Sequence, residues 1–359
     1  MYKTIGATLR LENGMEFKGF SFGYSKSVSG EVVFSTVMEG YPEQLTDAAY
    51  CGKILCLTYP LIGNYGVPSD ELLANGLSKN LESDRIHAKG LVVFDYCEDY
   101  SNWEAVESLD SWMKREQIPG IYGIDTRELA KILRDNGPMK AVIIPDSVEA
   151  EPFVDVAGEC LAEIVSCSEP IVYAPTADAI GKRVVVVDNG VMHSYIRALL
   201  AKGVEVVRVP WQYDFSGTEY DGLFISSGPG DPQTYSVEIE HIKKALEAKK
   251  PVFGLGLGML LVALAAGAQT KRLARPHRSA NQPVRRVDSN RAYITAQNAE
   301  FTVENLPADW STVYTNLNDG SIDGIRHKSL PFMGTQFNPE ACIGLNDNFT
   351  MKDEFISKL

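Results

Sequence analysis

The second half of the chain alternates continuous apolar runs with amphipathic stretches. Three runs of mainly Val, Ile, Leu and Phe predict buried strands: "RVVVVDNG" at 183–190, "VEVVRVP" at 204–210 and "PVFGLGLG" at 251–258. Between the first two, "SYIRALLAKG" at 194–203 predicts a helix. Buried strands that alternate with helices are typical of an α/β domain whose mainly parallel sheet is covered by helices on both faces.

Glycine-rich turns follow the strands of this predicted sheet. They are "DNG" at 188–190, "SSGPGDP" at 226–232 and "GLGLG" at 254–258. Ligands of open parallel sheets bind at the carboxyl ends of the strands. We therefore expect these turns to form the binding edge of the domain.

The first half has a different pattern. Its apolar runs are short and are separated by turn-rich segments: "EVVFSTVM" at 31–38, "KILCLTYP" at 53–60, "GLVVFDY" at 90–96 and "MKAVIIP" at 139–145. Helices are predicted near 106–116 and 126–136, the second with Asp125 or Thr126 as its N-cap and Gly137 just beyond its end. These elements predict a mixed α+β domain.

A change in composition separates the halves. Residues 146–180 are acidic and rich in Pro and Ala, which favours a linker with one short helix. We accordingly predict an N-terminal domain over 1–145, a linker over 146–180 and a second domain over 181–359. The last segment, "NDNFTMKDEFISKL", predicts a terminal amphipathic helix with Phe349, Phe355 and Ile356 facing inward.

The net charge of the chain disfavours some classes of binding partner. The chain has 34 Lys and Arg against 47 Asp and Glu, a formal net charge of −13, which disfavours nucleic acid and anionic membranes. No signal peptide or membrane-spanning run is evident, and we expect a cytoplasmic protein. Neither the six cysteines nor the five histidines have metal-ligand spacing, so we expect no metal and no cofactor.

The turn "GLGLG" admits two interpretations. A dinucleotide site is disfavoured because the spacing is G-x-G-x-G and because no acidic residue follows about twenty residues later. The alternative is a nucleophile elbow, a sharp strand-to-helix turn flanked by glycines. Gly254 and Gly258 would then be the flanking glycines, and Gly256 would occupy the elbow itself.

Many segments in one order resemble the small-subunit family of carbamoyl phosphate synthetase, whose second domain is a class I glutamine amidotransferase. The segments are "GEVVFSTVMEGYPEQLTDAAY" (30–50), "TYPLIGNYG" (58–66), "RIHAKGLV" (85–92), "GIDTREL" (123–129), "SSGPGDP" (226–232), "PVFGLGLGMLLVALAAGA" (251–268), "HRSANQPV" (277–284), "ITAQN" (294–298) and "QFNPEA" (336–341). The resemblance runs over essentially the whole chain.

The catalytic positions of that family are altered here. The family has a cysteine nucleophile at the elbow, where this chain has Gly256, and a histidine base where "QFNPE" places Asn338. Glu340 remains at the position of the residue that orients the base. Because an amide cannot accept a proton as imidazole does, nucleophile and base are both missing. Cys342 lies close by in sequence, but a structural thiol is the simpler interpretation.

The glutamine pocket implied by the resemblance is altered as well. Val37 and Leu260 replace a serine and a glutamine, and Glu300 replaces a glycine, where its side chain would enter the ligand's space. The positions that still match are Gly228, Gly230, Leu257, Asn298 and Phe301.

Three functions follow as alternatives. In the first, the chain pairs with a large carbamoyl phosphate synthetase subunit in a hetero-oligomer that uses free ammonia. In the second, it is a binding or regulatory module whose altered cleft holds another small molecule. In the third, it is a glutamine-hydrolysing subunit with an unrecognised nucleophile. Pyrimidine and arginine biosynthesis remain alternative pathways.

Overall fold

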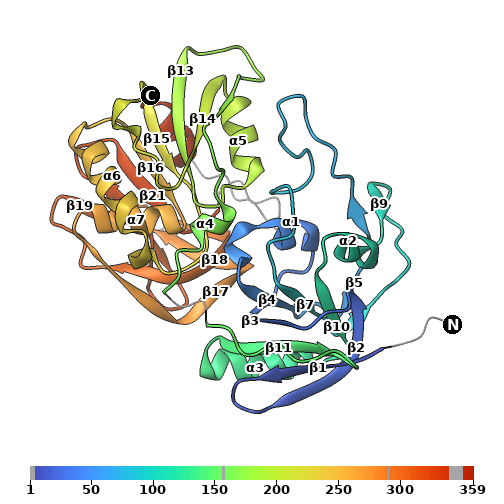
Figure 1. The fold of residues 1–359 in the computed structure, drawn as a ribbon. Coiled ribbons are helices and arrows are strands. Elements are labelled where there is room, and N and C mark those ends of the chain that lie inside the picture. The colour runs from blue at the N-terminus through green and yellow to red at the C-terminus, as the bar shows by residue number, and fades with distance from the viewer. Residues whose placement is uncertain (1–4, 156–157, 290, 339–350) are drawn as a thin grey trace. The chain divides into compact units, whose positions relative to one another are not determined.

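A computed structural model describes residues 5–155, 158–289, 291–338 and 351–359. The chain divides into two compact units, Met1–Ala157 and Gly158–Leu359, each described here by itself (Figure 1). The division falls within 146–180, the segment predicted as a linker. Part of that segment belongs to the second unit, because its residues Ile171–Tyr173 form a strand of the large sheet.

The first unit is a closed barrel. Its strands, in spatial order, are β1 (Gly6–Leu11), β11 (Met139–Pro145), β3 (Val28–Ser35), β4 (Lys53–Leu57), β7 (Gly90–Val92), β10 (Pro119–Tyr122) and β2 (Glu16–Gly23). Two two-stranded sheets, β5 (Leu61–Ile62) with β8 (Asp95–Tyr96) and β6 (Val67–Pro68) with β9 (Ala105–Glu107), accompany it. Leu9, Val32, Ile54, Val92 and Ile143 belong to one buried cluster. Closure of the barrel removes free edges from its seven strands.

Three helices and one 3₁₀ turn complete this unit: α1 (Tyr41–Thr46), η1 (Ala48–Tyr50), α2 (Leu109–Arg115) and α3 (Thr126–Asn136). Asp125 is the N-cap of α3, where its carboxylate accepts a hydrogen bond from the Glu128 amide at 2.9 Å. Gly137 follows the helix with a φ of +85°. The helix thus begins and ends where its capping residues predict.

The second unit is built on a ten-stranded sheet. The spatial order is β12 (Ile171–Tyr173), β14 (Val204–Pro210), β13 (Lys182–Asp188), β15 (Gly222–Ile225), β16 (Val252–Leu255), β21 (Phe332–Thr335), β20 (Ile322–His327), β19 (Trp310–Asn316), β17 (Gln269–Arg286) and β18 (Ala292–Glu304). The five strands from β14 to β21 are parallel. The predicted α/β class is therefore confirmed, with the parallel sheet in the middle of a larger mixed one.

Helices cover both faces of the parallel part. The helical elements are α4 (Ala162–Val165), α5 (His193–Leu200), η2 (Phe215–Gly217), η3 (Pro232–Thr234), α6 (Ser236–Glu247), α7 (Leu257–Ala265) and α8 (Met351–Ile356). On one face the rings of Phe224 and Phe253 pack between Tyr195 of α5 and Phe355 of α8. On the other, α6 and α7 pack on Leu223, Ile225 and Val252. Of the terminal residues predicted to face inward, Phe355 is buried, Ile356 is half-buried and Phe349 lies outside the described residues.

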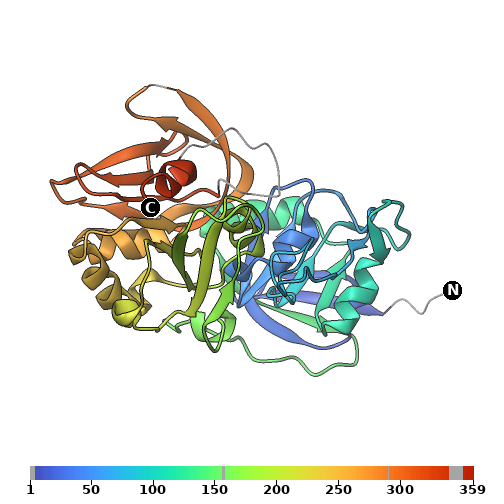
Figure 2. The same cartoon turned by 90° about the horizontal axis from the view of Figure 1, so that it is seen from above.

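The strands β17 to β20 form an antiparallel extension that the sequence did not predict. Figure 2 shows β17 and β18 as a long paired ribbon in orange. Register shifts between Arg272 and His277, and between Ser279 and Gln282, interrupt the pairing. Such irregularities break the two-residue alternation that reveals a strand in a sequence. No helix among the described residues is long and apolar enough to cross a membrane.

Candidate functional site

The turn between β16 and α7 is fixed by close backbone packing. Gly256 lies at the N-cap of α7 with φ +52° and ψ −115°, a conformation that side-chain-bearing residues rarely adopt. A Cβ on Gly254 would lie 2.5 Å from the carbonyl oxygen of Gly258, and one on Gly258 would lie 2.2 Å from that of Ile225. Both flanking positions therefore require glycine, and the elbow geometry predicted from the sequence is present.

Gly256 presents only backbone at this turn. Its amide donates to the Thr335 carbonyl oxygen at 2.7 Å, which ties the turn to the end of β21. A Cβ at position 256 would lie 2.8 Å from Oγ of Ser227, the second residue after β15. The Ser227 hydroxyl thus borders the space that a nucleophile's side chain would need.

The loop after β15 approaches the loop after β13. A Cβ on Gly228 would lie 2.1 Å from the carbonyl oxygen of Asn189, so this contact requires glycine. Gly230 has a φ of +88°. Because β13, β15, β16 and β21 are adjacent parallel strands, their carboxyl ends bring the predicted turns to one edge of the sheet.

Asn338, at the predicted base position, is engaged through both ends of its amide. Its Oδ1 accepts a hydrogen bond from the Tyr195 hydroxyl of α5, and its Nδ2 lies 3.7 Å from Sδ of Met192. Its backbone amide donates to the Ala296 carbonyl oxygen at 3.0 Å. The side chain therefore links α5 to the end of β21. Glu340 and Cys342 lie outside the described residues.

Glu300 belongs to a charged cluster on β17 and β18. Its carboxylate forms an ion pair with the guanidinium of Arg278 and lies 3.4 Å from Nη2 of Arg272. Arg278 Nε also donates to Oδ1 of Asn298 at 3.1 Å, while Asn298 Nδ2 is buried without a partner. The side chains of Arg278 and Glu300 are only 4% and 15% exposed, so this ion pair is largely shielded from water.

The remaining pocket positions are mainly apolar. Leu257 and Leu260 on α7 are buried in the main core cluster, and Phe301 on β18 packs against it while half-exposed. Val37 belongs to the first unit, two residues after β3, where its amide donates to Ser35 Oγ at 3.3 Å. Within the second unit, the position expected to hold a pocket amide instead adds apolar packing.

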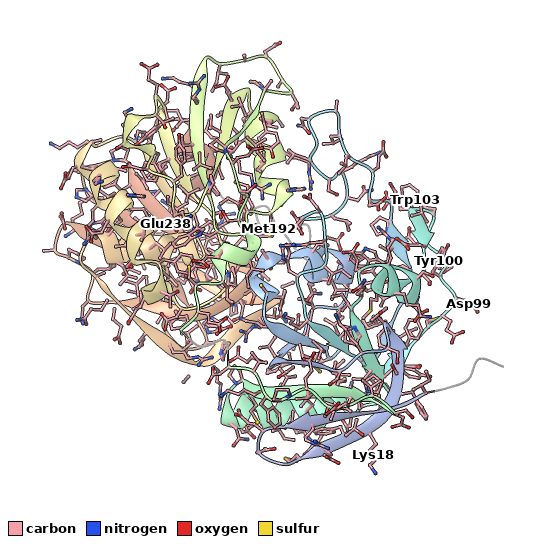
Figure 3. The ribbon with its side chains drawn as sticks, in the orientation of Figure 1. Lys18, Asp99, Tyr100, Trp103, Met192 and Glu238 are labelled. Atoms are coloured by element: carbon pink, nitrogen blue, oxygen red, sulfur yellow. The ribbon has the colours of Figure 1, made fainter. Side chains whose placement is uncertain are left out.

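The sequence predicted the "DNG" turn as part of the binding edge, but not the buried polar side chains that stabilise it. Asp188 is completely buried, accepts hydrogen bonds from the amides of Gly190 and Val191, and pairs with Arg208 at 2.7 Å. Asn189 Nδ2 donates to Glu238 Oε1 at 2.9 Å. Glu238 lies in the interior of the second unit (Figure 3), and burial raises the pKa of its carboxyl to about 8. A glutamate within "SVEIEHIKK" looks like a surface residue, so no sequence signal marked it.

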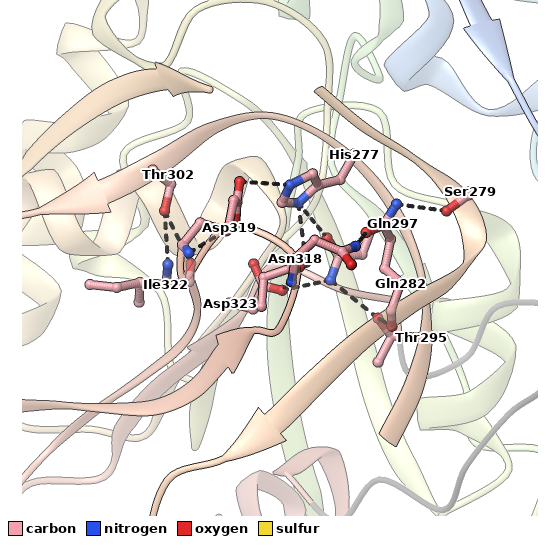
Figure 4. Close-up of polar contacts among 12 residues, drawn as sticks. His277, Ser279, Gln282, Thr295, Gln297, Thr302, Asn318, Asp319, Ile322 and Asp323 are labelled. Carbon is pink, nitrogen blue, oxygen red and sulfur yellow. Dashed lines mark hydrogen bonds and ion pairs between the residues drawn. The ribbon is translucent and has the colours of Figure 1, made fainter. Parts of the chain in front are cut away.

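His277 belongs to a buried polar network in the antiparallel extension (Figure 4). Its Nδ1 lies 3.1 Å from Gln297 Oε1, and its Nε2 lies 3.0 Å from Oδ2 of Asp319. Gln297 and Asn316 both donate to Asp323, whose pKa is raised to about 6 by burial. These contacts join β17, β18, β19 and β20 and leave the His277 ring fixed among them.

His327 and His193 lie elsewhere in the second unit. His327 Nδ1 accepts from the amide of Leu330 at 2.9 Å, and its Nε2 lies 3.1 Å from Asp309, so it organises the turn before β21. His193 is buried at the start of α5. Among the described residues, none of these contacts places a general base beside the elbow, and no group of three metal-ligating side chains is present.

Comparisons with known proteins cover both units. A family model described as the CPSase domain of the carbamoyl-phosphate synthase small chain matches residues 9–143, and one described as glutamine amidotransferase class-I matches residues 185–358.

Among curated relatives, human mitochondrial carbamoyl-phosphate synthase (ammonia) is 44% identical over 99% of this chain and 24% of its own length. The multifunctional protein CAD of Squalus acanthias is 44% identical over 98% of this chain and 16% of its own length. The chain thus spans about a quarter or less of these two relatives. Among solved structures, a glutamine amidotransferase from Thermotoga maritima is 17% identical over 45% of this chain and 76% of that chain, with a TM-score of 0.40.

Proposed function

The chain belongs to the carbamoyl-phosphate synthase small-chain family, and on that premise we propose that it is a small chain that does not hydrolyse glutamine. It pairs with a large synthetase subunit, or with the corresponding synthetase domain, and that synthetase takes its nitrogen from free ammonia. The observation that carries the proposal is Gly256 at the elbow: a thioester with glutamine's side-chain carbonyl needs a nucleophilic side chain there.

The base position supports the same conclusion. A general base must hold a lone pair that accepts the nucleophile's proton, and the amide of Asn338 has none of suitable basicity near neutral pH. Its oxygen already accepts a hydrogen bond from Tyr195. Loss of a nucleophile alone lowers turnover by roughly a millionfold in a triad hydrolase.

One of the two curated relatives favours an ammonia-using synthetase. The human relative carries ammonia in its name, and it aligns with 99% of this chain. Both curated relatives are several times longer than the region they share with this chain. A synthetase partner, fused or separate, is therefore the expected context of this sequence.

The test compares two nitrogen sources. The chain is combined with its cognate synthetase partner, and carbamoyl phosphate is measured with ammonium and with glutamine separately. We expect synthesis with ammonium and none above background with glutamine. Glutamine-driven synthesis at a comparable rate would contradict the proposal.

Restoration of the chemistry is a second test. Gly256→Cys combined with Asn338→His returns a thiol and an imidazole to the two positions, and glutamate release is the readout. The thiol's Cβ must share space with Ser227 Oγ, so Ser227→Gly is added as a third change. A gain of glutamate release would indicate that only the reactive groups are missing from the pocket. If no glutamate is released, the changes at Leu260, Glu300 and Val37 also prevent glutamine binding.

A repurposed pocket is the second candidate. The shielded ion pair of Arg278 with Glu300 and the buried side chain of Leu260 favour it, since loss of catalysis alone would not require changes in binding groups. A ligand that binds the folded chain raises its melting temperature by mass action. A thermal-shift screen of amides, amino acids and nucleotides therefore tests for a new ligand. Stabilisation by none of them favours the purely structural subunit.

A glutamine-hydrolysing subunit is the third candidate and requires another nucleophile. Burial raises the pKa of four of the five described thiols, Cys51, Cys56, Cys160 and Cys167, which lowers their thiolate fraction near neutral pH. Treatment with a glutamine-mimicking electrophile, followed by mass spectrometry of the intact chain, detects any hidden nucleophile, Cys342 included. A stoichiometric adduct would support this candidate.

A further inference from the structure

The first unit has a groove of about 930 Å³ with aromatic walls. Phe22 and Tyr96 stack with their ring centroids 4.6 Å apart, and Tyr122 lies 6.0 Å from Tyr96. Tyr24 contributes a fourth ring. The faces of aromatic rings carry partial negative charge and attract cations within about 6 Å.

Carboxylates share the lining of this groove. Glu98 and Asp99 are exposed at the groove, and the structure describes no ion pair for either. Asp110 accepts from the Gly23 amide at 2.7 Å and pairs with Lys114 at 2.5 Å, so its charge is already balanced. Lys26 lies 5.9 Å from the ring of Tyr24, the one described cation over a ring of this groove. An excess of negative charge therefore remains beside Tyr96 and Tyr122.

Apolar surface continues beyond the groove. Ile5 and Tyr24 line it and are exposed, and the exposed ring of Phe20 lies 5.5 Å from that of Tyr122. Four residues after Asp99 on the same segment, Trp103 is 87% exposed (Figure 3). Tryptophan is enriched among the residues that anchor protein interfaces, and the exposed Trp103 side chain is accessible to a partner. An occupant larger than a metabolite is needed to cover both the groove and this segment.

We propose that the groove receives an arginine or lysine side chain of the synthetase partner, with Trp103 as an apolar anchor beside it. An arginine guanidinium suits the site best. Its plane can stack on aromatic rings while two of its N–H groups donate hydrogen bonds to one carboxylate. Glu98 and Asp99 supply those carboxylates, and Tyr96 and Tyr122 supply the rings. The inference rests on the proposed partnership with a synthetase and adds the surface and the chemistry by which it is recognised.

The experiment measures the dissociation constant of the full chain and its cognate synthetase partner at low and high salt. The test variant is Glu98→Gln with Asp99→Asn, which keeps size and removes both charges. The matched control is Glu39→Gln with Glu149→Gln, two exposed acids of the same unit that neither line the groove nor adjoin Trp103. Trp103→Ser probes the anchor. Circular dichroism verifies that each variant is folded.

We expect the test variant to weaken binding by about tenfold or more at low salt, with a smaller difference at high salt, because exposed charge pairs are screened. The control should bind as the unchanged chain does. Trp103→Ser should weaken binding at every salt concentration, and ethylguanidinium added as a probe should compete with the partner. Equal binding of the test and control variants would overturn the inference while leaving the partnership intact.

Two further outcomes are distinguishable. If the unchanged chain does not bind the synthetase partner, the proposed function fails and the inference fails with it. If ethylguanidinium binds the groove but neither competes with the partner nor loses affinity selectively in the test variant, the occupant is not the partner's side chain. Either result contradicts the proposal.

Discussion

Two regions of the second unit contain positions that differ from the pattern expected of the family, and they are held in place by different means. The elbow, residues 254–258, is fixed by backbone atoms in direct contact, and its side chains at positions 254, 256 and 258 are absent. The second region is the charged cluster on β17 and β18. It is fixed by contacts among the polar side chains of Arg278, Asn298 and Glu300. The elbow therefore keeps its geometry with no side chain at position 256, because it is packed through backbone atoms.

Gly258→Ala is expected to disrupt the packing of the elbow most strongly. The added Cβ would lie 2.2 Å from the Ile225 carbonyl oxygen, so β15 or α7 must move. We expect a loss of about 3 kcal/mol or more in the free energy of unfolding, measured by urea denaturation. Gly217→Ala is the control, because its Cβ would meet open space. Equal stability of the two variants would contradict the packing described for the elbow.

Glu300→Gln removes the ion pair of the charged cluster on β17 and β18. It leaves the shielded guanidinium of Arg278 without its anionic partner, which should cost about 2 kcal/mol in the free energy of unfolding. Glu304→Gln is the matched control on the same two strands, since its pair with Lys271 is largely exposed and should contribute less than about 0.5 kcal/mol. Similar losses in the two variants would argue that shielding from water is unimportant here.

Gly256→Ala tests how strongly the backbone conformation at the centre of the elbow requires glycine. The positive φ and the contact with Ser227 Oγ should together cost about 1–2 kcal/mol. Ser227→Gly in the same chain should recover part of that loss, because it removes the contact but not the backbone strain. A double-mutant cycle of thermal or urea unfolding measures the coupling. Additive effects would show that Ser227 does not border the position as described.

Glu238→Gln should have the smallest effect of these substitutions at pH 5, where the folded chain holds the Glu238 carboxyl in its neutral form. The folded-state pKa of Glu238 is raised to about 8 by burial, above its ordinary value of 4.5. The folded chain thus holds a proton that the unfolded chain releases, and stability falls as pH rises from about 4.5 to 8. The glutamine variant has no proton to lose and should flatten that decline. Unfolding curves at pH 5, 7 and 9 measure it, and parallel declines in both chains would contradict the assignment.

The sequence anticipated the elements whose signals are local. Strands β13, β14 and β16 follow from mainly apolar runs, and α3 follows from its N-cap residue Asp125 and from Gly137 just beyond its end. The antiparallel extension escaped prediction because β17 reads "QTKRLARPHRSANQPVRR", where polar residues and two register shifts hide the alternation. Closure of the first barrel also escaped, because pairing of β1 with β11 joins segments more than a hundred residues apart.

By itself, the sequence determined that the elbow carries no nucleophile and that an amide stands where a base is expected, because these are properties of residue identity at recognisable positions. Only the tertiary structure decided the side-chain contacts of this unit: the Asn338 amide accepts from Tyr195, Glu300 pairs with Arg278, and Glu238 is buried beside Asn189. Those contacts join residues that are 22, 49 and 143 positions apart in the sequence. Chain folding sets such distances, and burial is the main cause of the raised pKa of Glu238.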